Sequence, residues 1–311
     1  MTPCTIYALP TCAKKHDSNR RGDRKSTFHR DPRSCQQRNI SSGGDKKIIR
    51  KHLKKMEKLT IVKVGGKIVE EAESLKQLLS DFSKIAGNKV LVHGGGRSAT
   101  AMATRLGIES QMVNGRRVTD EETLKVVTMV YGGLVNKQIV AGLQAIGVNA
   151  LGLTGADLNY MRSEKRPVKE VDYGFVGDVK EVDADLLSDL ISKGVVPVLA
   201  PLTHDQKGNL LNTNADTIAG EAAKALAKHF DVTLMYCFEK KGVLMNENDD
   251  DSVIETITPD LFEKYVQEGI IQGGMIPKLE NSFEAIRAGV TKVIITRADH
   301  IHTSGGTTIV K

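Results

Sequence analysis

The chain has 311 residues, of which 40% are hydrophobic and 26% charged, and its formal net charge is +6. This length and apolar content predict one large domain or two lobes around a sizeable core. No stretch approaches the roughly 18 consecutive apolar residues that indicate a transmembrane helix, so no membrane partner is expected.

The positive charge is confined to the start of the chain. Residues 1–56 contain 15 Lys and Arg but 4 Asp and Glu, a charge of +11, whereas residues 57–311 contain 29 and 34, a charge of −5. A mildly acidic body lacks the basic surface of nucleic-acid-binding proteins, so no nucleic-acid partner is expected. Cys237 is the single cysteine of the body, which favours a reducing, cytoplasmic location over a disulfide framework.

Residues 1–56 are predicted to be a disordered basic extension, because they are polar and show no sustained hydrophobic periodicity. Residues 46–59 are the exception, since their pattern allows a basic amphipathic helix. Met56 directly precedes the first predicted strand. This suggests the hypothesis that translation starts at Met56 and that residues 1–55 are not native.

Two short apolar strands that end in glycines open the body of the chain. A strand at 59–64 ends in Gly65 and Gly66, and a helix is predicted over 71–86. The next strand lies in KVLVHGGGRSAT, residues 89–100, and a helix over 98–106 follows its glycines. Such alternation predicts an α/β fold with a largely parallel sheet, whose two glycine turns face the same edge. Free amides and a helix N-terminus at these turns favour a phosphate-type anion.

A dinucleotide-binding site is the alternative, because residues 94–99 fit the pattern G-x-G-x-x-G/A. That site needs a strand ending in Asp or Glu about 20 residues beyond the glycines. The chain instead has Asn114-Gly115, a strong hairpin signal, followed by Arg116 and Arg117. We therefore favour phosphoryl transfer, which depends mainly on positioning and on charge stabilisation by lysines and amides.

The predicted hairpin at 111–118 has two interpretations: a lid that grips an anionic substrate through its arginines, or a solvated hairpin. The helix predicted from about residue 119 to about 146 is long and apolar enough to pack in the core and in a dimer interface.

The rest of the chain continues the α/β pattern. Four polar residues at 212–214 and 216 precede an apolar helix at 218–228, which is more than a helix cap needs. Asp249, Asp250 and Asp251 are expected to form a solvated loop and not a metal site. The other predicted elements are a strand at 150–155, a hairpin over 158–182, a helix at 186–193, strands at 195–200 and 232–238, helices at 259–268 and 279–288, and a strand at 292–296.

Five segments occur in the order typical of one family: KVGGK, LVHGGG, NGRRVT, LNTNADTIA and GGMIPK. Residues from about 59 to 311 therefore resemble the amino-acid kinase family. The resemblance implies a three-layer αβα sandwich around a mainly parallel eight-stranded sheet, the carbamate kinase-like fold. It also implies an N-terminal lobe, 57–230, for acyl-glutamate binding and dimerisation, and a C-terminal lobe, 231–311, for ATP.

The resemblance assigns roles to individual residues. Lys63 and Lys278 match the lysines that stabilise the transferring phosphoryl group, and Asp216 matches the aspartate that holds both lysines. The residues matching the substrate site are Gly95, Gly96, Arg117 and Asn212. The residues matching the ATP and phosphate site are Gly65, Gly66, Glu239, Lys240, Lys241, Gly242, Val243, Leu244, Ile270, Ile271 and Gln272. Where relatives usually carry an Asp-Val loop, this chain has Cys237–Lys241, CFEKK, which indicates altered nucleotide contacts.

The implied activity is ATP-dependent phosphorylation of the γ-carboxylate of N-acetyl-L-glutamate, in arginine biosynthesis, with Mg²⁺ arriving with ATP. A carboxylate with a pKa near ~4.3 is already ionised at pH 7, so Asp216 is expected to organise the site and not to accept a proton. N-succinylglutamate as substrate and a non-catalytic nucleotide or amino-acid sensor stay open as alternatives. An arginine-insensitive homodimer is expected, with an arginine-inhibited hexamer as its rival.

Overall fold

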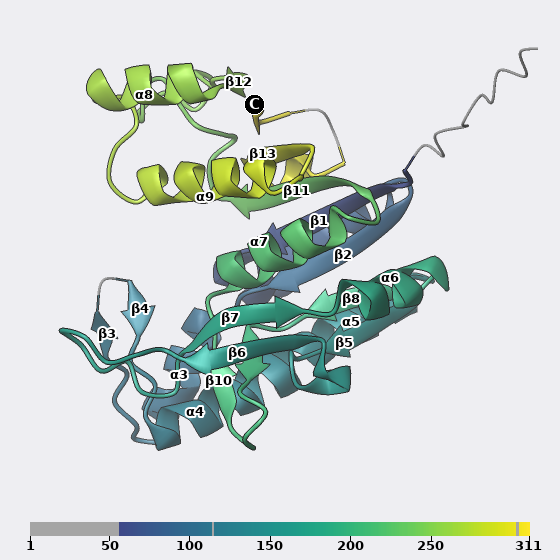
Figure 1. Ribbon diagram of the computed structural model, residues 1–311, viewed down its shortest axis with the longest axis vertical. Helices are drawn as coiled ribbons and strands as arrows, with labels where there is room; N and C mark the ends of the chain where they lie inside the picture. Colours follow the sequence, from purple (N-terminus) through teal and green to yellow (C-terminus); the bar gives the residue numbers. More distant parts are fainter. Residues whose placement is uncertain (1–55, 114, 303–304) are drawn as a thin grey trace, which may run out of the picture. The chain divides into compact units, whose positions relative to one another are not determined.

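The structure is a computed structural model that describes residues 56–113, 115–302 and 305–311 (Figure 1). The predicted disordered extension lies outside the described residues, except for Met56. The same holds for residues 46–55 of the predicted amphipathic helix, whereas Lys58 and Leu59 belong to the first strand.

A single eight-stranded sheet carries the fold. Its strand order is β12-β14-β13-β11-β1-β2-β8-β5, and all neighbours are parallel except β13 and β14. The mainly parallel sheet is therefore confirmed. Its strands are β1 (Lys58–Val64), β2 (Asn88–His93), β5 (Ala150–Leu153), β8 (Val196–Leu199), β11 (Asp231–Phe238), β12 (Thr256–Ile257), β13 (Lys292–Arg297) and β14 (Thr307–Ile309).

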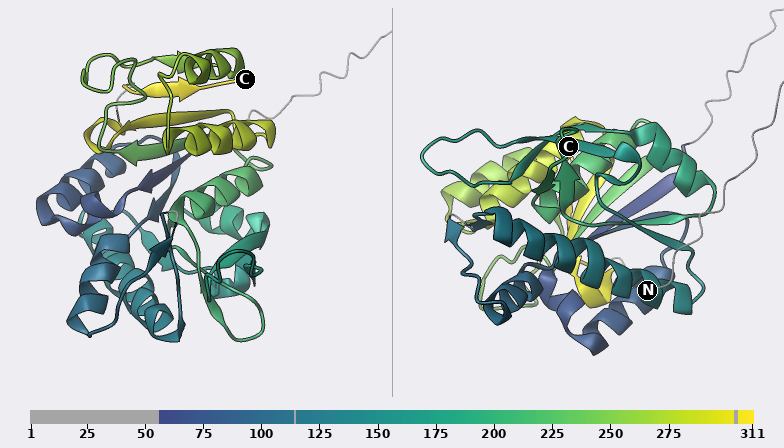
Figure 2. Two further views of the ribbon diagram at one scale, coloured as in Figure 1. Left: turned by 90° about the vertical axis from the view of Figure 1, so that its left-hand side faces the viewer. Right: turned by 90° about the horizontal axis from the view of Figure 1, so that it is seen from below.

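Helices cover both faces of this sheet, and the central strands are buried on both sides for that reason (Figures 1 and 2). Leu59 and Ile61 of β1 pack into one apolar cluster, and Val62 and Val64 pack into a second cluster on the opposite face. The helices on the first face are α6 (Ala184–Ser192), α7 (Ala215–Leu226), α8 (Pro259–Gln267) and α9 (Met275–Arg287). Those on the second are α1 (Gly66–Glu70), α2 (Ala72–Ser83), α3 (Gly96–Arg105), α4 (Glu121–Val127), η1 (Thr128–Val135) and α5 (Asn136–Ala145). The three-layer αβα sandwich is confirmed.

Several element boundaries differ from the sequence-based prediction. Helical structure begins at Gly66 and not at residue 71 as predicted. The extended backbone of Glu71 then divides the helical segment into α1 and α2. The short strands β9 (Leu202–His204), β10 (Leu210–Asn212), β12 and β14 were not predicted, since two or three residues are too few to show an alternating pattern.

Two smaller sheets lie beside the main one. The first has the order β10-β9-β6-β7 and includes β6 (Met161–Lys165), β7 (Gly177–Val182) and β10 (Leu210–Asn212). Its antiparallel pair β6–β7 confirms the hairpin predicted over 158–182. The second consists of β3 (Met112–Val113) and β4 (Arg116–Arg117), which confirms the hairpin at 111–118, although Asn114 is outside the described residues. Two 3₁₀ turns, η2 (Asp157–Asn159) and η3 (Ala298–His300), complete the fold.

The helical run from Glu121 to Ala145 comprises α4, the π-helical η1 and α5. It is 25 residues long and contains an 18-residue window with a mean hydropathy of 1.3, so it is the one helix among the described residues that could cross a membrane by length and composition. Core helices pass the same test, and this run buries Val130, Ile139 and Leu143 in the second apolar cluster.

A buried polar network supports the glycine turn after β2. The His93 side chain is fully buried, and its Nδ1 lies 2.7 Å from the Gly94 carbonyl oxygen. Asn136 lies under the same ring and donates from Nδ2 to His93 Nε2, at 3.1 Å, and to the Val198 carbonyl, at 3.0 Å. Nε2 therefore accepts and Nδ1 carries the proton, which is the neutral form of histidine.

This burial predicts a pH-dependent stability. Burial lowers the pKa of His93 from 6.5 to about 4, and the charge of Lys137 acts in the same direction. The unfolded chain takes up a proton on His93 near pH 6.5 and the folded chain only near pH 4, so the unfolded state is favoured as pH falls through this window. We expect the free energy of unfolding, measured in urea, to fall by roughly 3 kcal/mol between pH 6.5 and pH 4 because of His93.

His93→Gln is the matched control, because glutamine can donate to Gly94 and accept from Asn136 but does not titrate. The variant should lose this part of the pH dependence and keep the part due to carboxylates. Parallel curves for the two proteins would contradict the neutral buried histidine.

Candidate active site

The two glycine turns lie side by side at one edge of the main sheet. Parallel pairing of β1 with β2 sets Val64 opposite His93, and the Gly94 amide donates to the Val64 carbonyl at 3.0 Å. A Cβ atom on Gly94 would lie 3.2 Å from the Gly66 amide nitrogen, so the close approach of the two backbones favours glycine. The expectation that both turns face the same edge is confirmed.

The turn after β2 ends in the N-terminus of α3. Gly95 has φ = 156°, and a Cβ atom there would lie 2.9 Å from Cδ1 of Tyr131, so only glycine fits. No side chain caps α3, although the Ser98 amide donates to Glu70 at 2.7 Å. The remaining amides of this first turn have no intrahelical partner and are suited to an anion.

Lys63 and Asp216 form an ion pair beside these turns. Lys63 is the penultimate residue of β1, and its Nζ lies 2.7 Å from Oδ1 of Asp216. Asp216 stands in the first turn of α7, which the Asn214 side chain caps by accepting from the amides of Asp216 and Thr217. The Asn214 cap sets where α7 begins. It therefore also sets the position of the Asp216 carboxylate that pairs with Lys63.

Lys278 joins this pair from α9, in a different part of the chain. Its Nζ lies 4.0 Å from the centroid of the Phe238 ring, and Nζ of Lys63 lies 5.5 Å from the same ring. Burial lowers the pKa of Lys278, the Asp216 carboxylate raises it, and the Lys63 charge lowers it. The structure therefore brings the two lysines to one aromatic ring, Phe238, which was not predicted, and pairs Asp216 with Lys63.

A pocket of about 210 Å³ borders the second glycine turn, residues 94–96. The predicted substrate residues Gly95, Gly96, Arg117 and Asn212 all line it. The other lining residues come from the same turn, the β3–β4 hairpin, the helical run, the β6–β7 hairpin, the link between β8 and β9, and the start of α7: Gly94, Met112, Gly115, Arg116, Tyr131, Arg166, Val176, Gly177, Pro201, Thr213, Asn214, Ala215 and Thr217.

Arg117 is 8% exposed and ties the hairpin to α3. It donates from NH1 to Oγ of Ser110, and from NH2 to the Gly96 carbonyl, at 2.9 Å, and to Oγ1 of Thr100, at 2.8 Å. Asn212 donates to Oγ1 of Thr119, which in turn donates to the Arg117 carbonyl. The two predicted substrate residues are therefore linked through Thr119, and the hairpin has one buried arginine, Arg117, and one exposed arginine, Arg116.

A second pocket, next to both glycine turns, is lined by Gly65, Gly66, Gly96, Cys237, Phe238 and Glu239, together with Lys67, Ile68 and Arg97. Glu239 lies between two cations, with Oε1 3.4 Å from Lys67 Nζ and 3.9 Å from Arg97 NH2. Neither Lys67 nor Arg97 was predicted from the sequence to belong to the site. The signal was nevertheless present, because a cation directly follows each glycine turn.

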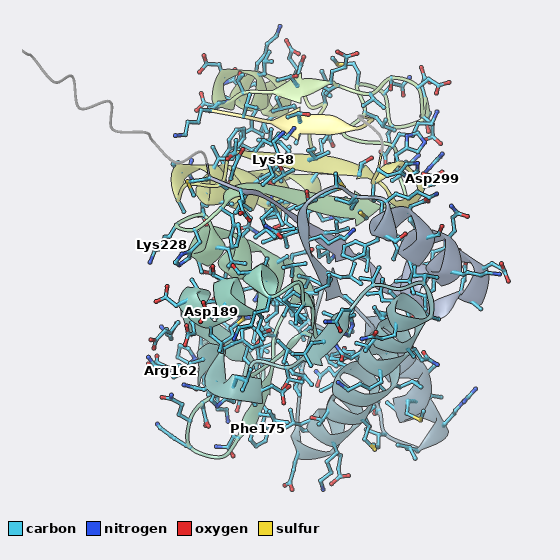
Figure 3. The ribbon with its side chains drawn as sticks, turned by 90° about the vertical axis from the view of Figure 1, so that its right-hand side faces the viewer. Lys58, Arg162, Phe175, Asp189, Lys228 and Asp299 are labelled. Atoms are coloured by element: carbon cyan, nitrogen blue, oxygen red, sulfur yellow. The ribbon has the colours of Figure 1, made fainter. Side chains whose placement is uncertain are left out.

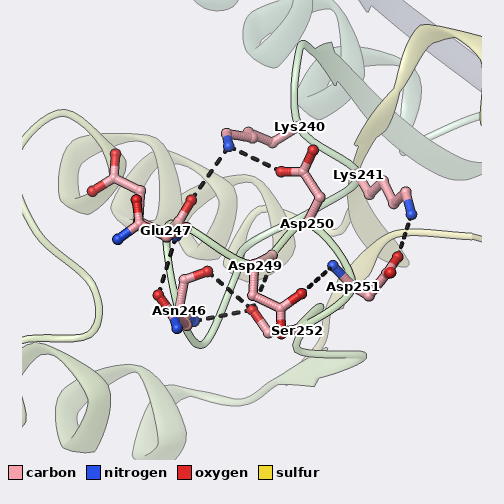
Figure 4. A network of polar contacts seen from close by, with 9 residues as sticks. Lys240, Lys241, Asn246, Glu247, Asp249, Asp250, Asp251 and Ser252 are labelled. Carbon is pink, nitrogen blue, oxygen red and sulfur yellow. Dashed lines mark hydrogen bonds and ion pairs between the residues drawn. The ribbon is translucent and has the colours of Figure 1, made fainter.

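The other predicted ATP residues are not among those that line this pocket. Lys240 pairs with Asp250 at 2.9 Å and donates to the Glu247 carbonyl, and Lys241 pairs with Asp251 (Figure 4). Gly242, Val243 and Leu244 pack as a turn, in which the Val243 amide donates to Oγ1 of Thr307. Ile271 is buried in the first apolar cluster, next to the partly buried Ile270, while Gln272 is exposed.

Known proteins that resemble this chain identify its family. The family model described as the amino acid kinase family matches residues 58–297. The chain is 75% identical to an acetylglutamate kinase of Parabacteroides distasonis over 254 residues, which cover 82% of this chain and 100% of the relative. It is 76% identical to an acetylglutamate kinase of Bacteroides thetaiotaomicron over 255 residues, which cover 82% and 99% of the two chains.

A solved structure shares the fold. Carbamate kinase from Giardia lamblia bound to AMP-PNP superposes with a TM-score of 0.61 at 15% identity and covers 83% of this chain and 99% of its own. The family match, the relatives and the shared αβα architecture together show that the chain belongs to the amino acid kinase family.

Proposed function

We propose that this protein is an ATP-dependent kinase that phosphorylates the γ-carboxylate of N-acetyl-L-glutamate, the second step of arginine biosynthesis. The observation that carries the proposal is the Lys63–Asp216 ion pair, which lies beside Lys278 and two glycine turns. The relatives that are 75% and 76% identical over nearly their whole length are acetylglutamate kinases. The acyl phosphate of the substrate and ADP are the products.

The chemistry needs charge stabilisation more than proton transfer. The substrate carboxylate has an ordinary pKa near ~4.3 and is already a nucleophile at pH 7. Negative charge on the moving phosphoryl group would be balanced by the ammonium groups of Lys63 and Lys278 and by the amides of Gly66, Gly95 and Gly96. In this proposal Asp216 orients the lysines, because it already neutralises Lys63 in the free protein.

Substrate orientation is assigned to the pocket behind the second glycine turn. The planar guanidinium of Arg117 suits a bidentate contact with a carboxylate of the substrate, and Asn212 supplies an amide on the same wall. Both residues are already held in place by hydrogen bonds, which reduces the ordering needed when substrate binds.

ATP would enter from the neighbouring pocket, whose walls include Gly65, Gly66 and Glu239. Mg²⁺ is part of the proposal as an ion brought by the ATP phosphates. Among the described residues no group of three or more His, Cys, Asp or Glu side chains could hold a metal ion. Mg²⁺ does not need such a cluster, because it is usually bound through substrate phosphates and water. When bound, it would neutralise phosphate charge.

The two-lobe division is likewise a proposal. The substrate pocket is lined by residues from 94 to 217, within the proposed N-terminal lobe 57–230. Phe238, Glu239 and Lys278 come from the proposed ATP lobe 231–311.

We place the enzyme in the cytoplasm, because its free and buried Cys237 fits a reducing compartment.

An ADP-release assay over a panel of acylated glutamates tests the function. With ATP and Mg²⁺, N-acetyl-L-glutamate should give the highest kcat/KM, with N-succinyl-L-glutamate as the closest competitor and free glutamate as the control. A higher kcat/KM for the succinyl compound would change the acyl group assigned. No ADP release with any of them would favour the sensor and contradict the kinase.

Each catalytic lysine can be tested separately. Lys63→Ala and Lys278→Ala should each lower kcat by about a hundredfold to a thousandfold, because each removes a positive charge from the transition state. Lys228→Ala is the control, since Lys228 is exposed just beyond the C-terminal end of α7, away from Asp216 in its first turn (Figure 3). Near-normal kcat in either active-site variant would remove that lysine from the mechanism.

A homodimer is proposed from the exposed apolar face of the helical run 121–145, where Met129 is 54% and Leu134 46% exposed. Leu134→Glu should convert the dimer into a monomer in size-exclusion chromatography with light scattering, because it would bury a charge at the interface. Met245→Glu, at a residue 44% exposed in the other proposed lobe, should leave the dimer intact. A wild-type monomer, or a dimer that survives Leu134→Glu, would contradict this interface, and a hexamer would add a second one.

A further inference from the structure

Phe238 stands where the catalytic charges meet, although its side chain has no group that reacts. It is the last residue of β11, which pairs in parallel with β1 so that Cys237 lies opposite Val64. Phe238 therefore directly follows the last residue of β11 that pairs with β1, and it lies beside the first glycine turn. Its ring lines the proposed ATP pocket together with Gly65, Gly66 and Glu239.

The two catalytic lysines are not held in the same way. Lys63 has a carboxylate partner, Asp216, at 2.7 Å. Among the ion pairs found in residues 56–113, 115–302 and 305–311, none involves Lys278. Its Nζ lies instead 4.0 Å from the centroid of the Phe238 ring, well within the range of a cation–π interaction.

The contact between Lys278 and the Phe238 ring offsets an imbalance of charge at the site. Lys63 and Lys278 bring two positive charges, and Asp216 supplies one negative charge. The second ammonium group is partly removed from water, and burial and the Lys63 charge both disfavour its charged form. The negative face of an aromatic ring compensates such a cation without adding an anion that would repel phosphate.

The ring itself is held in a fixed orientation. Tyr236 stacks on Phe238 with centroids 6.2 Å apart and planes at 21°. The Tyr236 hydroxyl donates to the backbone carbonyl of Asp216 at 3.5 Å. Contacts therefore run from the Asp216 backbone through Tyr236 and Phe238 to the Lys278 ammonium group.

We propose that Phe238 is a positioning residue for phosphoryl transfer, whose ring face holds the Lys278 ammonium group beside Lys63 and Asp216 before ATP binds. The inference rests on the proposed kinase activity and adds a residue to it. Phe238 lies in the segment CFEKK, residues 237–241, and its ring is a contact that the sequence alone did not predict.

Site-specific fluorination of Phe238 tests the proposal, because fluorine weakens the ring's negative face while nearly preserving its shape. With 4-fluoro-, 3,5-difluoro- and 3,4,5-trifluorophenylalanine at position 238, kcat should fall stepwise, by about threefold to thirtyfold over the series. The KM for N-acetyl-L-glutamate should stay within about twofold. The same three substitutions at Phe262, which packs against Phe283, are the control and should leave kcat unchanged. A flat kcat series at position 238 would overturn the proposal.

A readout independent of activity separates this proposal from the kinase function. Lysines labelled by reductive ¹³C-methylation report their titration by NMR, and Lys278→Arg identifies the Lys278 signal. That signal should lie upfield in the ring current of Phe238 and shift downfield in Phe238→Leu, with a lower apparent pKa because the ring no longer supports the charged form. Phe238→Tyr should restore both properties. An unchanged Lys278 signal in Phe238→Leu would overturn the proposal even if the enzyme is an active kinase, whereas loss of ADP release in the wild type would contradict only the kinase.

Discussion

The ion pair between Lys63 and Asp216 is the contact on which the site depends. It joins the central strand β1 to the first turn of α7, two elements about 150 residues apart in sequence. Without the carboxylate, two lysines in a partly buried corner would repel one another and lose their charge or their position. The parallel pairing of β1 with β2 and β11 brings both glycine turns and Phe238 to the same corner.

Much of this arrangement could be predicted from sequence, because it depends on short-range patterns. Apolar strands ending in glycines predicted the parallel sheet, and the missing acidic strand end excluded a dinucleotide site. Arg117 and Asn212 were assigned through the family pattern, and the structure brings both to one pocket. Asn214 caps α7, which explains one member of the polar group before that helix.

The parts that could not be predicted depend on contacts across the sheet. Phe238 reads as an ordinary strand residue, and only the structure sets its ring 4.0 Å from Lys278. The family pattern assigned Lys240 and Lys241 to the ATP and phosphate site, and only the structure pairs them with Asp250 and Asp251 of the acidic loop that follows. Lys67 and Arg97 were overlooked because a lysine or arginine at a helix start has no recognisable periodicity.

The most direct test of the account asks whether Asp216 organises charge or accepts a proton. The measurement is kcat against pH, from about 5 to 9, for the wild type and Asp216→Asn at saturating ATP and N-acetyl-L-glutamate. If Asp216 only organises charge, Asp216→Asn lowers kcat throughout this range, with no acidic limb gained or lost. An acidic limb in the wild type that disappears in Asp216→Asn would show that Asp216 is a general base and would contradict the account.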